Sequence, residues 1–255
     1  MKNTLRLIIL LSALSMVSSI MRASQFNDES LNYKVLFKWG LVQKQAGTAK
    51  LTLTSDGSYY TAKLYARSDN WADHFYKLRD TLITRMDIVD NLPVHYERIA
   101  HEKDSYAHDI IVIDKRNENV KGQIKRIRQG KNSALTEDDL EVEAKGATVD
   151  MLSAFYYIRC IDFTKKLPGF EKKINIFSAK KRETLTIRYI GREDIDIDGK
   201  RHRSFKVTFN FTTDGKNKSS DDIETWIWDN QSRIPLKMDG KLKVGRIRCI
   251  YTGSN

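Results

Sequence analysis

The chain has 255 residues and a formal net charge of +11, with 40% hydrophobic and 30% charged residues. This composition is typical of a folded globular protein, so it excludes wholesale disorder, collagen and a long coiled coil. Two cysteines are too few for a disulfide-built scaffold or a cysteine-rich zinc module. The length suits one large β domain or two small domains.

Residues 1–23 have the pattern of a secretory signal peptide. Basic residues precede an apolar run from 7 to 21, small residues follow, and the segment contains no acidic residue. The run is shorter than the roughly 20 residues that a transmembrane helix needs, and an uncleaved anchor is the alternative. Cleavage after Ser19, with Val17 at position −3, fits the pattern better than cleavage after Ala23, with Met21 at that position. We therefore expect residues 24–255 to form a single exported domain, periplasmic or associated with the cell envelope.

The positive charge indicates which partners to expect in that compartment. A basic exported protein meets anionic membrane surfaces, lipid headgroups and acidic glycans. Peripheral contact with an anionic membrane surface is therefore expected, and nucleic acid is not expected as a partner.

Most of the remaining chain alternates apolar and polar residues with period two, as β-strands with one buried face do. The clearest runs are 31–39, 48–54, 59–67, 173–177, 185–190 and 205–211, and further runs cover 81–89, 93–102, 106–114, 223–229 and 241–251. Tight hairpins are predicted at Asp56-Gly57, Asp198-Gly199, Asp214-Gly215 and Asp239-Gly240. The sequence predicts a mainly β fold, with a large curved antiparallel sheet that forms a half-barrel or a barrel-like structure.

Two segments have helical spacing instead. The first covers 70–80, and the second covers 148–160, where Thr148 or Asp150 can cap the first turn. One face of the second segment carries Met151, Leu152, Phe155, Tyr156 and Arg159. Such an apolar face must cover something, so we expect one or two short helices to pack on the concave face of the sheet. The segments 130–137 and 165–170 are predicted to be loops.

A calcium loop is suggested by Asp194, Asp196 and Asp198-Gly199, but it fails at its last ligand. Such a loop needs a bidentate glutamate at its twelfth position, where this chain has Phe205. The alternating isoleucines between the acids favour an edge strand that enters a hairpin.

A second metal hypothesis concerns the histidines. His95, Glu97 and His101 share one strand face, and His108 lies on the next run. Imidazole and carboxylate groups bind divalent metals, but this spacing is not specific for a metal site. Ordinary strand residues are the simpler explanation, and no metal or other cofactor is predicted.

Catalytic motifs are missing from the sequence. It contains no G-x-S-x-G elbow, no Walker loop and no G-x-G-x-x-G. No catalytic residue is therefore predicted. Carboxylates are abundant at strand ends and in loops, and a glycan hydrolase would require two of them at a set separation across a cleft.

Clusters of basic residues are the candidates for binding an anionic group. They are Arg126 with Arg128, Lys172 with Lys173, and Arg246 with Arg248. A continuous basic stripe would attract phosphate or carboxylate groups, and a scattered solvated surface is the alternative.

The two cysteines, Cys160 and Cys249, allow two interpretations. They could pair as a disulfide in an oxidising compartment, or they could be two small buried thiols.

Four motifs resemble a known family, the bacterial exported domain-of-unknown-function family 3108, in the version common in Bacteroides-like bacteria. They are Lys38-Trp39-Gly40-Leu41 with Ala46-Gly47, Asp80-Thr81, the stretch DMLSAFYYIR at 150–159, and Trp226-Ile227-Trp228 followed by Arg233-Ile234-Pro235-Leu236. The resemblance spans about residues 31 to 251. It implies an exported protein without an established activity. It also implies an architecture similar to the half-barrel of lipoprotein-localisation factors, in which a curved antiparallel sheet wraps apolar helices.

Three functional hypotheses follow. The first is a non-catalytic exported protein that binds or carries a hydrophobic, lipid-like or amphiphilic ligand in a groove between the sheet and the 148–160 helix. The candidates for this groove, or for the helix–sheet core, are Met151, Phe155, Tyr156, Trp226 and Trp228. The second is an interaction module of the cell envelope, in which an exposed strand edge accepts a partner protein. The third is a glycan hydrolase.

Overall fold

The computed structural model describes residues 25–178, 180–213, 219–242 and 244–254, so the predicted signal peptide lies outside the described residues. Within these ranges the chain forms one 15-stranded sheet, two α-helices and a short 3-10 helix. The elements are β1 Glu29–Trp39, β2 Val42–Ser55, β3 Tyr59–Ser68, α2 Asn70–Tyr76, β4 Leu78–Asp87, β5 Pro93–Glu102, β6 Ser105–Arg116, β7 Asn119–Gln129, β8 Thr136–Lys145, β9 Thr148–Asp150, α3 Ser153–Cys160, η1 Phe163–Lys165, β10 Glu171–Ser178, β11 Lys181–Ile197, β12 Lys200–Thr213, β13 Ile223–Trp228, β14 Pro235–Lys241 and β15 Arg246–Ser254.

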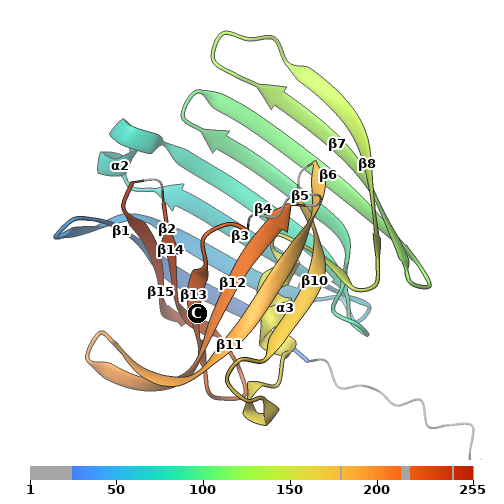
Figure 1. Cartoon of the computed structure of the whole chain (residues 1–255). Helices are drawn as coiled ribbons and strands as arrows, with labels where there is room; N and C mark the ends of the chain where they lie inside the picture. The colour runs from blue at the N-terminus through green and yellow to red at the C-terminus, as the bar shows by residue number, and fades with distance from the viewer. Residues whose placement is uncertain (1–24, 179, 214–218, 243, 255) are drawn as a thin grey trace, which may run out of the picture.

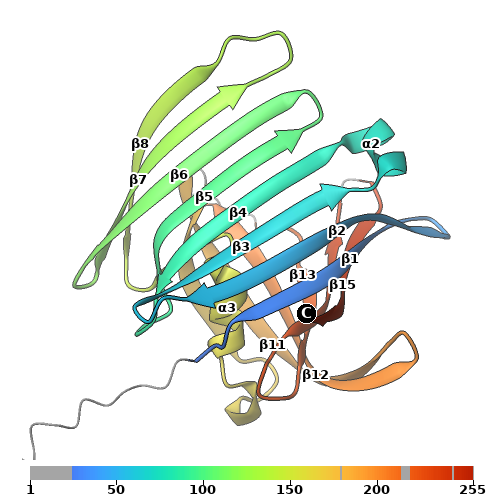
Figure 2. The same ribbon diagram turned by 180° about the vertical axis from the view of Figure 1, so that it is seen from behind.

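The strand order makes the sheet one continuous wall. It runs from β8 down to β1, continues through β15, and then descends to β9. Figures 1 and 2 show that the sheet curls until its two ends approach each other. There, Asn175 of β10 donates from Nδ2 to the backbone oxygen of Lys145 on β8, at 2.7 Å. The predicted mainly β, curved antiparallel fold is confirmed, and only β9 pairs in parallel, with β10.

Helix α3 lies on the concave side and joins the two halves of the sheet (Figure 1). Leu152, just before the helix, and Tyr156 pack in a core cluster built mostly by β1 to β8. Ala154 and Ile158, on the opposite side of the helix, pack in a second cluster built by β9 to β13. Both sides of α3 are therefore filled by side chains of the sheet.

The helix is shorter than the sequence predicted. It begins at Ser153, because Thr148–Asp150 instead form β9 and pair with Asn175–Phe177 of β10. The carboxylate of Asp150 accepts hydrogen bonds from the backbone N–H groups of Leu152 and Ser153, so it closes the turn that leads into the helix. Met151 consequently lies in this turn and not on the helix.

Helix α2 lies in the connection between β3 and β4, at the ends of the strands (Figure 1). Trp71 anchors it by donating from Nε1 to the backbone oxygen of Gln45, at 2.6 Å. Phe75, which the helical spacing placed on the same face as Trp71, is 76% exposed. Of the two helices in the described residues, α3 is the one that fills the concave face.

The predicted Asp-Gly hairpins have mixed outcomes. Turns form at Asp56-Gly57 and at Asp198-Gly199, and both Asp198 and Gly199 have positive φ. Asp239-Gly240 was predicted wrongly, because both residues lie inside β14. There the carboxylate of Asp239 accepts hydrogen bonds from two arginines of β15, and this partnership replaces the turn. Asp214-Gly215 lies outside the described residues.

Strand β8 begins inside the segment 130–137 that was predicted to be a loop. Its sequence, TEDDLEVEAK, is rich in acids and mostly exposed, and apolar residues alternate only in its second half, at Leu140, Val142 and Ala144. Salt bridges attach it to β7, from Lys121 to Glu141 at 2.7 Å and from Lys125 to Glu137 at 3.0 Å. Opposite charges across the strands thus add to the contacts that Val142 and Ala144 make with the core on the other face of β8.

Gly47 is required by a close approach between β2 and β3. A Cβ atom at this position would lie 2.3 Å from the backbone oxygen of Arg67. We expect Gly47→Ala to lower the free energy of unfolding by roughly 1–3 kcal/mol, because the two strands must move apart. Gly240→Ala is the matched control, since its nearest neighbour would lie 3.6 Å away. Urea unfolding measures both variants, and equal losses would contradict the explanation.

Candidate functional site

Two rows of paired residues cross the concave face from β2 to β8. Neighbouring strands place them side by side, and strand alternation points them to the same side as the core. The first row reads Leu51, Leu64, Leu82, Arg98, Asp109, Arg126 and Asp138. The second row reads Ala49, Ala66, Asp80, Ala100, Ala107, Arg128 and Thr136. Along the first row, three leucines are thus followed directly by four charged side chains.

Asp109 is the centre of the charged part. Its side chain is fully buried and accepts hydrogen bonds from Nε of Arg126, at 3.2 Å, and from Nη2 of Arg128. Arg98 lies 3.9 Å from its second oxygen and also donates to Asp80, at 3.2 Å. The predicted pair Arg126 and Arg128 therefore does come together, on an acid that the sequence did not indicate.

The charged network has hydrogen-bonding groups left over. Oδ2 of Asp109 and Oδ1 of Asp80 are buried and accept no hydrogen bond from the described residues. Burial also raises the pKa of Asp80. Arg126 bonds to the described residues through Nε alone, so its two terminal nitrogens are available. The network can thus bond a further polar group without being broken.

The predicted groove residues on the helical segment are mostly core. Tyr156 is fully buried and Phe155 is partly buried, and their ring centroids lie 5.3 Å apart. The guanidinium of Arg159 lies over both rings and over Phe26. Met151 is 43% exposed. Phe155 and Tyr156 are brought together, and the space between α3 and the sheet is occupied.

Trp226 and Trp228 lie elsewhere, in a separate small cluster. Ile227 packs on the concave side, in the same cluster as Ala154 and Ile158 of α3. Trp226 alternates with Ile227 along β13, so the tryptophans point to the outside of the sheet. The distal part of the β11–β12 hairpin covers them, and Asp198 at its tip forms a 2.8 Å salt bridge with Lys34 of β1. Figure 1 shows this hairpin curling away from the rest of β11 and β12.

The predicted basic clusters do not form one stripe. Arg246 and Arg248 are both bound to Asp239, each at 2.6 Å, on the outside of β14 and β15. Lys172 and Lys173 are exposed, and Lys173 pairs with Glu171 at 3.3 Å. Arg126 and Arg128 are the one predicted pair whose two side chains both face the concave side.

Both cysteines are free thiols, so the structure does not contain the disulfide that was one of the two interpretations, and each is partly buried. Cys160 and Cys249 pack against the same core cluster. Burial raises the pKa of each thiol to about 11, which keeps both protonated and unreactive at neutral pH.

The residues considered as metal ligands have other partners. Asp194 bonds to Arg201 across the hairpin, and Glu97 contacts His108 at 2.6 Å. Over the ranges described, no group of three or more His, Cys, Asp or Glu side chains is arranged to hold a metal ion. Among the same residues, no helix is long and apolar enough to cross a membrane.

Comparison with solved structures identifies a similar fold. The crystal structure of a β-barrel-like protein of the domain of unknown function DUF1849 from Brucella abortus matches with a TM-score of 0.58 and 11% sequence identity. The match covers 91% of this chain and 99% of that chain, and at this identity it concerns the fold alone. A search of curated proteins found no match. The family described as "Protein of unknown function (DUF3108)" matches residues 32–250, and the chain belongs to this family.

Proposed function

We propose that the protein is exported and that it binds an amphiphilic, lipid-like ligand on the concave face without catalysing a reaction. The observation that carries the proposal is the row in which Leu64 and Leu82 are followed by Arg98, Asp109 and Arg126. An apolar chain would lie along the leucines, and an anionic head group would reach the arginines.

The apolar part of the surface can contribute binding free energy. Leu64 and Leu82 are only partly buried, and so are Met238 and Cys249 on the facing part of the wall. Covering such surface stabilises a complex by about 25 cal/mol per Å² of apolar area. The four alanines of the second row extend no further than Cβ, so they add little bulk beside the leucines.

The polar part is held in place before a ligand arrives. Asp109 binds Arg126 and Arg128, so their guanidinium groups need little further ordering. The terminal nitrogens of Arg126 match the two oxygens of a carboxylate or a phosphate. A head group there would form charge-assisted hydrogen bonds that replace water.

The proposal is tested with palmitate and two variants of the protein, residues 24–255. We expect Arg126→Gln and Ala107→Leu each to weaken binding about tenfold, the first by removing the charged contact and the second by filling the alanine row. Val112→Phe is the control, because Val112 lies on the outside of β6, the strand that carries Ala107 on its inside. Isothermal titration calorimetry gives the affinities, and thermal unfolding shows that each variant is folded.

Two outcomes would contradict the proposal. One is the absence of palmitate binding to the unchanged protein. In that case, native mass spectrometry of the protein purified from its own periplasm should show the mass of the protein without any bound ligand. The other is an equal loss in Val112→Phe, which would place the ligand on another surface. Recovery of a chain beginning near residue 24 from that compartment tests the export.

A second candidate function is a cell-envelope interaction module, and strand β8 favours it. β8 is the last strand at one end of the sheet and is exposed along nearly its whole length. Its acidic residues would suit a basic strand of a partner protein. Photo-crosslinking from Asp138 in the native envelope would capture such a partner, and a crosslink to lipid alone would count against it.

A further inference from the structure

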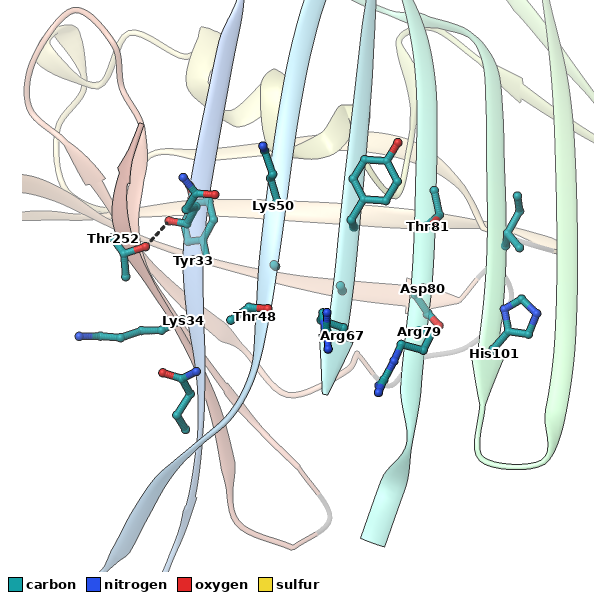
Figure 3. A pocket seen from close by; sticks show the side chains of 16 residues that line it. Tyr33, Lys34, Thr48, Lys50, Arg67, Arg79, Asp80, Thr81, His101 and Thr252 are labelled. Atoms are coloured by element: carbon teal, nitrogen blue, oxygen red, sulfur yellow. Dashed lines mark hydrogen bonds between the residues drawn. The ribbon is translucent and has the colours of Figure 1, made fainter. Parts of the chain in front are cut away.

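A pocket of about 720 Å³ lies on the outside of the sheet, over β1 to β5 (Figure 3). Its position follows from strand alternation. Lys50, Tyr65 and Thr81 are paired across β2, β3 and β4, and they alternate with the inward-pointing Leu51 and Leu64. The pocket is therefore separated from the concave face by the thickness of the sheet.

Two arginines oppose each other in this pocket. Arg67 of β3 is paired in register with Arg79 of β4. Arg79 is neutralised by Asp73 of α2, at 2.6 Å, whereas Arg67 forms no ion pair among the described residues. Like charges directly across two strands are unfavourable, and an anion beside Arg67 would remove the penalty.

The other charges leave the pocket positive. Lys50, which is paired with Tyr65 on the same face, also forms no ion pair with any described residue, and Figure 3 shows its side chain pointing away from Arg67. The acids nearby are occupied, because Asp198 pairs with Lys34 and Asp80 pairs with Arg98. Lys50 and Arg67 are thus two separate cations in the pocket, and each could bind its own carboxylate.

The remaining lining has an aromatic surface and free hydroxyl groups. The Tyr65 ring is 47% exposed, and Ile99 lies one strand beyond Thr81 on the same face. The hydroxyls of Thr48 and Thr81 form no hydrogen bond within the described residues, and Figure 3 shows them on either side of β3. A half-exposed ring binds flat, weakly polar surfaces, and free hydroxyls bind other hydroxyls.

We propose that this pocket binds a carboxylated saccharide. Carboxylates of different sugar units would lie beside Arg67 and beside Lys50, and the C–H face of a sugar ring would lie on Tyr65. The hydroxyls of the sugar would bond to Thr48 and Thr81. A plain fatty chain would satisfy neither the two cations nor the threonines. The site is independent of the concave face, and it fits a protein that meets acidic glycans in the envelope.

The test uses a galacturonic acid oligomer and the neutral galactose oligomer of the same length, with the protein from residue 24 onward. The acidic oligomer is expected to bind, and more weakly as salt is raised. Arg67→Gln and Tyr65→Ala should each weaken this binding about tenfold. Lys63→Gln is the matched control, because Lys63 lies on the same face of β3 but does not line the pocket.

Three results would overturn the proposal: no binding of the acidic oligomer, equal binding of the neutral oligomer, or an equal loss in Lys63→Gln. A phosphate-bearing lipid head group is distinguished with phosphatidylglycerol vesicles. If vesicles bind in an Arg67-dependent way and the oligomer does not, the ligand is a lipid and the saccharide proposal fails. Arg126→Gln should leave oligomer binding unchanged. The oligomer experiment therefore tests the saccharide pocket independently of the proposed ligand site on the concave face.

Discussion

Replacing Arg159 with methionine is expected to lower the free energy of unfolding by roughly 3–5 kcal/mol. The side chain of Arg159 is only 1% exposed and binds both carboxylate oxygens of Glu29, at 2.5 and 3.0 Å. It also donates to the backbone oxygen of Ser232, at 2.9 Å. Removing the guanidinium leaves the carboxylate of Glu29 largely buried without its counter-charge, and that is the costly state.

Urea unfolding is measured for Arg159→Met alone and for Arg159→Met combined with Glu29→Gln. The comparison separates the loss of the arginine contacts from the cost of burying an unpaired carboxylate. The double variant should recover much of the loss, because no unpaired charge is then buried. Arg116→Met, which breaks an exposed pair with Asp114, should change stability little. A small loss in the single Arg159 variant, or no recovery in the double variant, would show that the ion pair does not hold α3 to β1.

The Asp150→Asn variant is expected to lose a large part of the pH dependence of stability. Asp150 is fully buried beside Thr84, and burial raises the pKa of its carboxyl to about 6 from an ordinary value of 3.8. Because the pKa is higher in the folded state, the protonated acid favours folding. Protonated Asp150 contributes about 3 kcal/mol to the free energy of unfolding. This contribution is fully present below about pH 4 and is lost as the pH rises through about 6.

The free energy of unfolding of both proteins, measured in urea from about pH 4 to about pH 7.5, checks this expectation. An asparagine can accept from the backbone N–H groups of Leu152 and Ser153 and can donate to Thr84, so the contacts are kept while the charge is removed. Asp139→Asn, at an exposed position of β8, should give a curve parallel to that of the unchanged protein. Parallel curves for Asp150→Asn would contradict the raised pKa.

Local patterns predicted much of the sheet. Ile195 and Ile197 alternate with acids and indicated a strand that enters a hairpin, and β11 indeed ends at the Asp198-Gly199 turn. The same approach failed at the start of β8, where acidic residues pair with lysines of β7, whereas Val142 and Ala144 near its end pack against the core. Helical spacing likewise led us to begin the helix at Thr148, and pairing of Thr148–Asp150 with β10 overrode it.

The candidate site was predicted only in part. Arg126 and Arg128 share a strand face in any extended conformation, so their proximity was available from spacing alone. Asp109, which binds both, lies 17 and 19 residues earlier, and nothing in its neighbourhood distinguishes it from other acids. The pocket outside the sheet escaped prediction for the same reason, because it is assembled from strands that the sequence could not order.

The amino-acid sequence by itself determined which side chains share a face of each strand, since alternation is a property of the local backbone. It therefore separated Trp226 from Ile227 before any contact was known. Tertiary structure decided what each face meets. It placed the tryptophans under the β11–β12 hairpin and joined Arg159 to Glu29, 130 residues away. Such contacts depend on strand order and on the curl of the sheet, which the whole chain sets through packing rather than any local segment.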